Sequence, residues 1–176
     1  MESCSSFTSE TRIHIALFEG LENANELRQR LLASDATLSF AFIDAAIVVS
    51  KLQVLLAAQK ALDNEARQTL KTHNVHSEIV FNLSPTTNIS ESLRRFGISK
   101  DTKAMVVVKI SQEPTPDIEA RLRELVKGHL VPLSGLGQHV DIKRIDKYYK
   151  LNGIPHLTAD NRVDLVIGAM AVKSIA

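Results

Sequence analysis

The sequence predicts a single compact α/β domain in which a small mixed sheet is flanked by several helices. Apolar runs with the two-residue period of strands alternate with stretches whose apolar residues recur every three to four positions, as in amphipathic helices. The 176 residues are enough for one hydrophobic core, and no repeat or low-complexity linker divides them. We expect residues 1–11 to form a flexible tail and residues 12–176 to form the domain.

Two strands and one helix are expected before residue 50. Residues 13–18 alternate in the manner of a strand, and residues 22–34 carry leucines at helical spacing. Residues 40–50, FAFIDAAIVVS, form an apolar run rich in β-branched side chains, which favours a buried strand.

The next segment predicts the longest helix. Ser50 followed by Gln53 matches a capping box, in which each side chain satisfies an unpaired backbone N–H. One face is expected to be buried and the other to be polar. The first comprises Leu52, Leu55, Leu56, Gln59, Leu62 and Ala66, and the second Gln53, Lys60, Asn64, Arg67 and Lys71.

The stretch EIVFNLSPTTNISESLRRFGIS follows. Its residues 79–83 read as an apolar strand that Pro85 ends. Asn88 is expected to cap the next helix with Glu91 at the reciprocal position, and Gly97 to supply a left-handed stop.

The second half predicts a central strand at 104–110, a helix from Thr115, an edge strand limited by Pro132, and a helix within 141–150. The last helix, VDLVIGAMAVKSIA, is apolar around most of its circumference. Such a helix is either wrapped by its own domain or partly covered by another chain.

Composition and charge bound the function. The net charge is +1, from 21 basic and 20 acidic residues, so the whole molecule is not a polycation, although a local basic stripe stays open. Cys4 is the single cysteine, which favours a reducing compartment. The first residues lack a secretory pattern, and no apolar run approaches the roughly 20 residues of a membrane span. We expect a soluble intracellular protein without a membrane partner.

Catalytic, metal and cofactor motifs are missing. No glycine-rich phosphate loop, zinc spacing or nucleophile elbow occurs. His73 and His76 read as an incidental surface pair, since a metal site needs a complete ligand set. We therefore expect no metal, cofactor or catalytic residue. The alternative is a small enzyme near the Phe81–Ser84 strand end that uses Ser84 or His76.

Arg94 and Arg95 have two interpretations. Both can pair with Glu91, at three and four residues' distance, on a solvated helix face. They can also join the lysines and arginine of the preceding helix in a basic groove for nucleic acid.

The segment EIVFNLSPTTNISESLRRFGISKDT resembles the signature of the PRPK-binding protein (TPRKB) family, the small non-catalytic subunit of the KEOPS complex, also called EKC. The likeness continues in VVSKLQVLLAAQKAL, KGHLVPL and DIKRIDKYYKL, and covers the chain from about Ile13 onward. In FIDAAIVVSKLQ two prolines that are frequent in relatives are missing.

The resemblance implies a kinase-binding accessory domain of the cytoplasm and nucleus. It would dock on the N-lobe of a small atypical kinase-like ATPase, within the complex that makes threonylcarbamoyladenosine in tRNA. Archaeal relatives hold the tRNA 3′ end, so the candidate tRNA-binding residues are Lys60, Arg67, Lys71, Arg94 and Arg95. The candidate kinase contacts lie on the apolar last helix: Val166, Met170, Val172 and Ile175.

Overall fold

The computed structural model describes residues 1–6 and 10–173 and contains one five-stranded sheet. Its strands are β1 (Glu2–Ser5), β2 (Arg12–Glu19), β3 (Ala41–Asp44), β4 (Ala104–Ser111) and β5 (His129–Val131). The order is β1-β2-β4-β3, and β5 also pairs with β2. The predicted single compact α/β domain is confirmed.

The sheet is antiparallel in all the pairings of these strands, so the expectation of a mixed sheet was wrong. The near-continuous apolar run of β4 is typical of parallel strands, which are buried on both faces. Here helices cover both faces of an antiparallel sheet, and this burial produces the same apolar pattern.

The outer edge of β2 is shared by two short strands. β1 pairs with residues 12–15 of β2 and β5 with residues 17–19. Unpaired backbone groups at a sheet edge need partners, and both strands supply them to β2. The flexible tail predicted for residues 1–11 is therefore wrong where β1 forms, and residues 7–9 of that segment lie outside the described residues.

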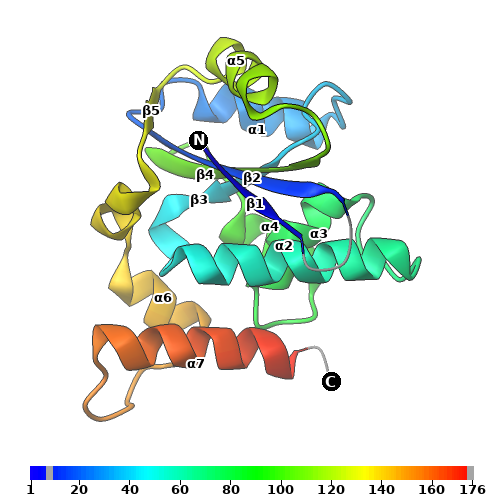
Figure 1. The fold of residues 1–176 in the computed structure, drawn as a ribbon. Helices are drawn as coiled ribbons and strands as arrows, with labels where there is room; N and C mark the ends of the chain where they lie inside the picture. Colours follow the sequence, from blue (N-terminus) through cyan, green and yellow to red (C-terminus); the bar gives the residue numbers. More distant parts are fainter. Residues whose placement is uncertain (7–9, 174–176) are drawn as a thin grey trace.

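Helices lie on both sides of the sheet (Figure 1). One side carries α1 (Ala24–Leu32) and α5 (Thr115–Leu125). The other side carries α2 (Lys51–Ala66), α3 (Val75–Leu83), α4 (Ile89–Phe96), α6 (Ile142–Tyr148) and α7 (Ala159–Val172). Two short 3-10 helices complete the fold, η1 (Ala45–Ile47) and η2 (Leu133–His139). Each side of the sheet has its own buried apolar cluster, so two cores share one sheet.

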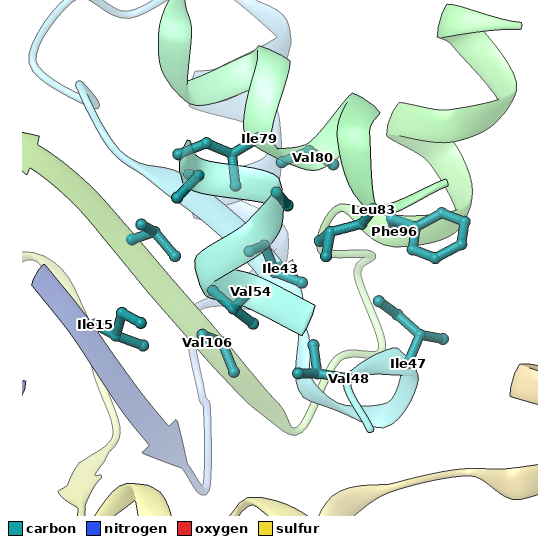
Figure 2. Close-up of a cluster of buried hydrophobic side chains, with 14 of the residues drawn as sticks. Ile15, Ile43, Ile47, Val48, Val54, Ile79, Val80, Leu83, Phe96 and Val106 are labelled. Carbon is teal, nitrogen blue, oxygen red and sulfur yellow. The ribbon is translucent and has the colours of Figure 1, made fainter. Parts of the chain in front are cut away.

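The segment expected to be a strand at 79–83 is the helix α3. Asn74 and Ser77 form a capping box at its start, and nearly every side chain of the helix is buried. Figure 2 shows Ile79, Val80 and Leu83 of this helix among the other core side chains. Periodicity cannot separate a helix buried on all sides from a buried strand, because both are apolar throughout.

Helix α2 buries a different face from the predicted one. Ser50 caps it as expected, but the side chain of Gln53 accepts from Val49 N and donates to the Tyr149 hydroxyl. Alanines fill the contact with the rest of the domain, whereas Leu52 and Leu56 are exposed. Small side chains let α3 approach α2 closely, so the widest side chains do not mark the buried face.

Helix α4 begins as predicted but ends differently. Asn88 accepts from Glu91 N and caps the helix. Gly97 is extended, with φ −74° and ψ 171°, so the expected left-handed stop is absent. Glycine is needed for another reason, since a Cβ would lie 2.6 Å from the carbonyl oxygen of Leu93. No helix in the described part of the chain is long and apolar enough to cross a membrane.

Candidate functional site

A pocket of about 570 Å³ opens where α2, α3 and the end of α7 meet the start of α4. Three lysines line it, Lys60, Lys71 and Lys173, and its other lining residues are Asn64, Thr69, Phe81, Asn82, Thr87 and Ile89. Residues far apart in the sequence thus form one cationic hollow, which suits an anionic or polar ligand.

The loop that carries Lys71 is held by a buried carboxylate. Glu78 accepts hydrogen bonds from Lys71 N at 3.0 Å and from Thr72 N at 2.9 Å. Its other oxygen accepts from Asn64 Nδ2 at 2.9 Å. Glu78 therefore orders the rim of the pocket and places a negative charge beneath its lysines.

Lys173 closes the pocket from the end of α7. Its ammonium donates to the backbone carbonyl of Phe81 and lies 3.2 Å from the centroid of the Phe81 ring. Burial, with a smaller contribution from the charge of Lys60, lowers the pKa of Lys173 to about 7 against the opposing effect of Glu78. Burial also lowers the pKa of Lys60. The ammonium groups crowd together in a partly desolvated site, where an anion would relieve their repulsion.

Asn82 offers an unused acceptor at the same place. Its Nδ2 donates to the Ala57 carbonyl at 3.2 Å, while Oδ1 is buried without a hydrogen-bond partner. Buried polar atoms usually have partners, and an exception in a pocket wall often marks a position that a ligand or water completes.

Two of the five predicted tRNA-binding residues line the pocket, and the other three lie elsewhere. Lys60 and Lys71 line the pocket, but Arg94 and Arg95 lie toward the other end of α4. Arg95 pairs with Glu91 at 2.5 Å, as one interpretation predicted, and Arg94 is exposed. Arg67 is exposed at the C-cap of α2 and does not line the pocket.

The predicted kinase contacts on α7 are partly buried and partly exposed. Val166 and Met170 are buried in the domain's own core, so their side chains do not face outward. Val172 is 62% exposed, and Ile175 lies outside the described residues. Leu165 is 37% exposed and stands seven residues before Val172, which places both on one face with Gly168 between them. The outer face of α7 is therefore a short apolar strip.

The alternative catalytic residues are not brought together. Ser84 is buried and its Oγ accepts from Thr86 N, whereas His76 Nε2 accepts from Ile110 N. The two lie at opposite ends of α3, about 12 Å apart along the helix axis at 1.5 Å per residue. His76 is buried and His73 is exposed, so the two do not form the predicted surface pair. No cluster of metal-ligating side chains exists among the residues that the structure describes.

Comparison with known proteins shows the class to which this fold and surface belong. Residues 18–174 match the family model described as "Kinase binding protein CGI-121". The chain belongs to this family of kinase-binding proteins.

Several relatives are similar over nearly the whole chain. A Gibberella zeae protein named EKC/KEOPS complex subunit CGI121 is 41% identical over 182 residues, which cover 93% of this chain and 92% of the relative. The Aspergillus terreus protein of that name is 40% identical, with 92% and 90% covered. The Schizosaccharomyces pombe protein is 34% identical, with 93% and 94% covered. The predicted family resemblance is confirmed.

Three residues at the pocket were not predicted from the sequence. Lys173 lies at the end of an apolar helix, and Asn82 fell in a predicted strand that is in fact a helix. Glu78 holds the rim of the pocket and directly precedes that predicted strand. One signal was present: polar residues inside an otherwise apolar run, four apart, indicate one face of a helix. Glu78 and Asn82 have this spacing.

Proposed function

We propose that this chain is the non-catalytic accessory subunit that binds the small atypical kinase-like ATPase of the EKC/KEOPS complex. In this role it supports threonylcarbamoyladenosine modification of tRNA, in the cytoplasm and nucleus. Family membership carries the proposal, because the family model describes kinase-binding proteins and the relatives are named as subunits of this complex.

The outer face of α7 is the kinase-docking surface in this proposal. Leu165 and Val172 present apolar side chains to solvent, and Gly168 between them allows a close approach by another chain. Val166 and Met170 contribute indirectly, because they anchor the helix to the core. Scattered apolar residues are common on surfaces, so the aligned spacing and the family together support this assignment.

The test is co-purification of the chain with the kinase subunit. The double variant Leu165→Glu/Val172→Glu is expected to weaken binding at least tenfold, about 1.4 kcal/mol. Leu32→Glu is the matched control, because Leu32 is 66% exposed on α1, across the sheet. Unchanged binding by a folded double variant, or equal loss in the control, would refute this surface.

A second role, contact with the tRNA 3′ end, is favoured by the lysine pocket. Three ammonium groups, an aromatic ring and an unpaired amide oxygen are the groups that a single-stranded RNA end can use. Lys60 and Lys71 carry the phosphate contacts in this proposal. Arg67, Arg94 and Arg95 lie outside the pocket and would act only on more distant nucleotides.

Affinity for tRNA across salt concentrations tests this role. Each single-strand phosphate contact contributes about 0.7 to the slope of log affinity against log salt. We expect Lys60→Gln/Lys71→Gln to lower affinity and flatten the slope by about 1.4. Arg121→Gln/Lys127→Gln, with the same charge change on the other side of the sheet, should leave the slope unchanged. An identical slope in the pocket variant and wild type would contradict the contact.

The absence of catalysis is also part of the proposal. The separation of Ser84 from His76 supports it, because no nucleophile and base can meet there. The purified chain alone should show no ATPase or hydrolase turnover above a heat-denatured sample. Turnover that depends on Ser84 would revive the enzyme alternative.

A further inference from the structure

A second cationic surface lies at the far end of α4, on α6 and the turn that follows it. Lys143, Lys147 and Lys150 are exposed, and none of them forms an ion pair with another described residue. The two acids of this segment are already engaged. Asp141 accepts from Arg144 N as the helix cap, and Asp146 pairs with Arg162 of α7 at 2.9 Å. The three lysines therefore face solvent without a carboxylate of the described residues at ion-pair distance.

An aromatic ring organises two more cations beside them. The guanidinium of Arg95, from α4, lies 5.0 Å from the centroid of the Tyr148 ring, and that of Arg144 lies 5.7 Å from it. Phe96 supports the ring from the core side, with centroids 5.8 Å apart. Each guanidinium also has a carboxylate partner, Glu91 for Arg95 and Asp44 for Arg144, at 2.5 and 2.9 Å. Guanidiniums held in this way lose little further freedom when they bind an anion.

This arrangement differs from the basic residues of the α1 and α5 side. There Arg121 pairs with Glu113, Arg123 with Glu119 and Lys127 with Glu26. The basic residues of α5 and the loop after it are thus matched with acids, whereas the lysines at 143, 147 and 150 are not. A solvated helix face of the ordinary kind resembles the first arrangement.

Helix α4 links this surface to the lysine pocket. Ile89, the first residue of α4, lines the pocket, and Arg95 stands six residues later, about 9 Å along the axis at 1.5 Å per residue. A chain of phosphates that leaves the pocket along α4 would meet Arg95 next and then the lysines of α6.

We propose that Arg95, Lys143, Arg144, Lys147 and Lys150, arranged around Tyr148, form an α6 basic surface that binds the phosphodiester backbone of RNA. The inference rests on the proposed tRNA contact and extends it from the terminal nucleotides to the following part of the strand. The continuity with the pocket favours RNA over an acidic protein segment. Tyr148 is a positioning residue, because it holds the two guanidiniums and does not itself carry charge.

The experiment measures the salt dependence of tRNA affinity for Lys143→Gln/Lys147→Gln/Lys150→Gln. The loss of three phosphate contacts should reduce the slope of log affinity against log salt by about 2 to 3. Each single-strand contact contributes about 0.7 and each duplex contact about 0.9. Arg121→Gln/Arg123→Gln/Lys127→Gln changes the net charge equally and should keep the wild-type slope. A four-nucleotide RNA that matches only the tRNA 3′ end should bind the α6 triple variant as tightly as wild type.

Tyr148 gives a separate readout. Tyr148→Leu should flatten the slope by about 1, because two guanidiniums lose the ring that orients them but keep their carboxylate partners, while Tyr148→Phe keeps the ring and the slope. Thermal unfolding identifies any variant whose fold is impaired.

The outcomes separate this inference from the proposed tRNA contact. If the α6 triple variant keeps the wild-type slope while Lys60→Gln/Lys71→Gln weakens binding, the α6 inference is overturned and the pocket stands. If the wild-type chain binds tRNA no better than both triple variants, with a flat salt response, the tRNA contact fails as well. If the α6 variant loses a protein partner at an unchanged tRNA slope, the surface serves an acidic protein segment instead.

Discussion

The two sides of the sheet differ in whether their buried polar side chains find hydrogen-bond partners within the chain, as two buried asparagines show. Asn23, on the α1 and α5 side, donates to the Leu125 carbonyl and accepts from Lys127 N, both at 3.0 Å. Asn82, on the other side, leaves Oδ1 without a partner at the lysine pocket. The amide of Asn23 uses both its donor and its acceptor within the chain. The amide of Asn82 keeps its acceptor oxygen available for a ligand or water.

Charges repeat the contrast. The arginines of α5 are paired with acids, whereas the lysines of α6 have no ion-pair partner among the described residues and those of the pocket lie near one another. Clustered cations destabilise a domain slightly, so their accumulation on one side indicates a role in binding anions. Both sides contain a buried core, and the proposed binding surfaces all lie on the side with α2–α4, α6 and α7.

The largest expected effects come from the two buried phenylalanines that support the two sides. Phe18→Ala and Phe96→Ala should each cost about 3–5 kcal/mol of unfolding free energy, because each removes a fully buried ring. Only Phe96→Ala should also weaken tRNA binding under conditions where both variants are folded, because Phe96 contacts Tyr148 and Tyr149. Urea unfolding and tRNA titration measure the two quantities. An equal loss of tRNA affinity in both variants would contradict the difference between the two sides of the sheet.

His76 should make the α3 side sensitive to acid. Burial lowers its pKa from 6.5 to about 4, with a smaller contribution from Lys109, so the folded protein keeps it neutral. Below pH 6.5 the unfolded chain binds the extra proton, and stability falls until about pH 4. The full loss is roughly 3 kcal/mol at 1.36 kcal/mol per pKa unit. His76→Gln should remove this part of the acid destabilisation, as measured by urea unfolding at pH 7 and pH 4.5. A wild-type pH profile in the variant would contradict the assignment.

Lys173 should produce a smaller pH dependence of stability, and at alkaline rather than acidic pH. Its pKa of about 7 lies below the ordinary 10.5, so the unfolded chain binds more protons between these values and stability rises with pH. The Phe81 ring and carbonyl return part of the cost of burial, which limits the size. Lys173→Met should flatten the rise between pH 7 and 9 in thermal unfolding. A rise that persists in the variant would assign it to another group.

The smallest effects are expected from the ion pairs of α5. Arg121→Ala and Arg123→Ala each remove an exposed pair, worth about 0–1 kcal/mol. Neither should alter tRNA affinity, and the small stability change should shrink further in 1 M salt. An effect on tRNA affinity equal to that of Lys147→Ala would remove the distinction between the two sides.

Much of the fold could be predicted from the sequence, because most elements have a clear period or cap. β2, β4, the Ser50 cap of α2 and the Asn88 cap of α4 follow from short-range patterns. Helix α3 did not, since a segment buried on every side has no polar face to reveal its period. The exposed Leu52 and Leu56 were misplaced for a related reason: close packing selected alanines for the buried face of α2.

The candidate site could be predicted only in part. Lys60 and Lys71 were among the predicted residues, but the pocket also needs Lys173, which comes from a distant segment, and Glu78, which holds its rim. Charge counting could not separate the paired arginines of α5 from the unpaired lysines of α6. That separation depends on which acids lie nearby in three dimensions, as Asp146 with Arg162 shows.

Amide hydrogen exchange tests the division of the molecule most directly, with the chain assembled with its kinase partner and measured before and after addition of tRNA. Assembly is predicted to slow exchange in α7, and tRNA is predicted to slow it in residues 69–74, α4 and α6, with α1 and α5 unchanged at both steps. Protection that appears in α1 and α5, and not in α4, α6 or α7, would contradict the account.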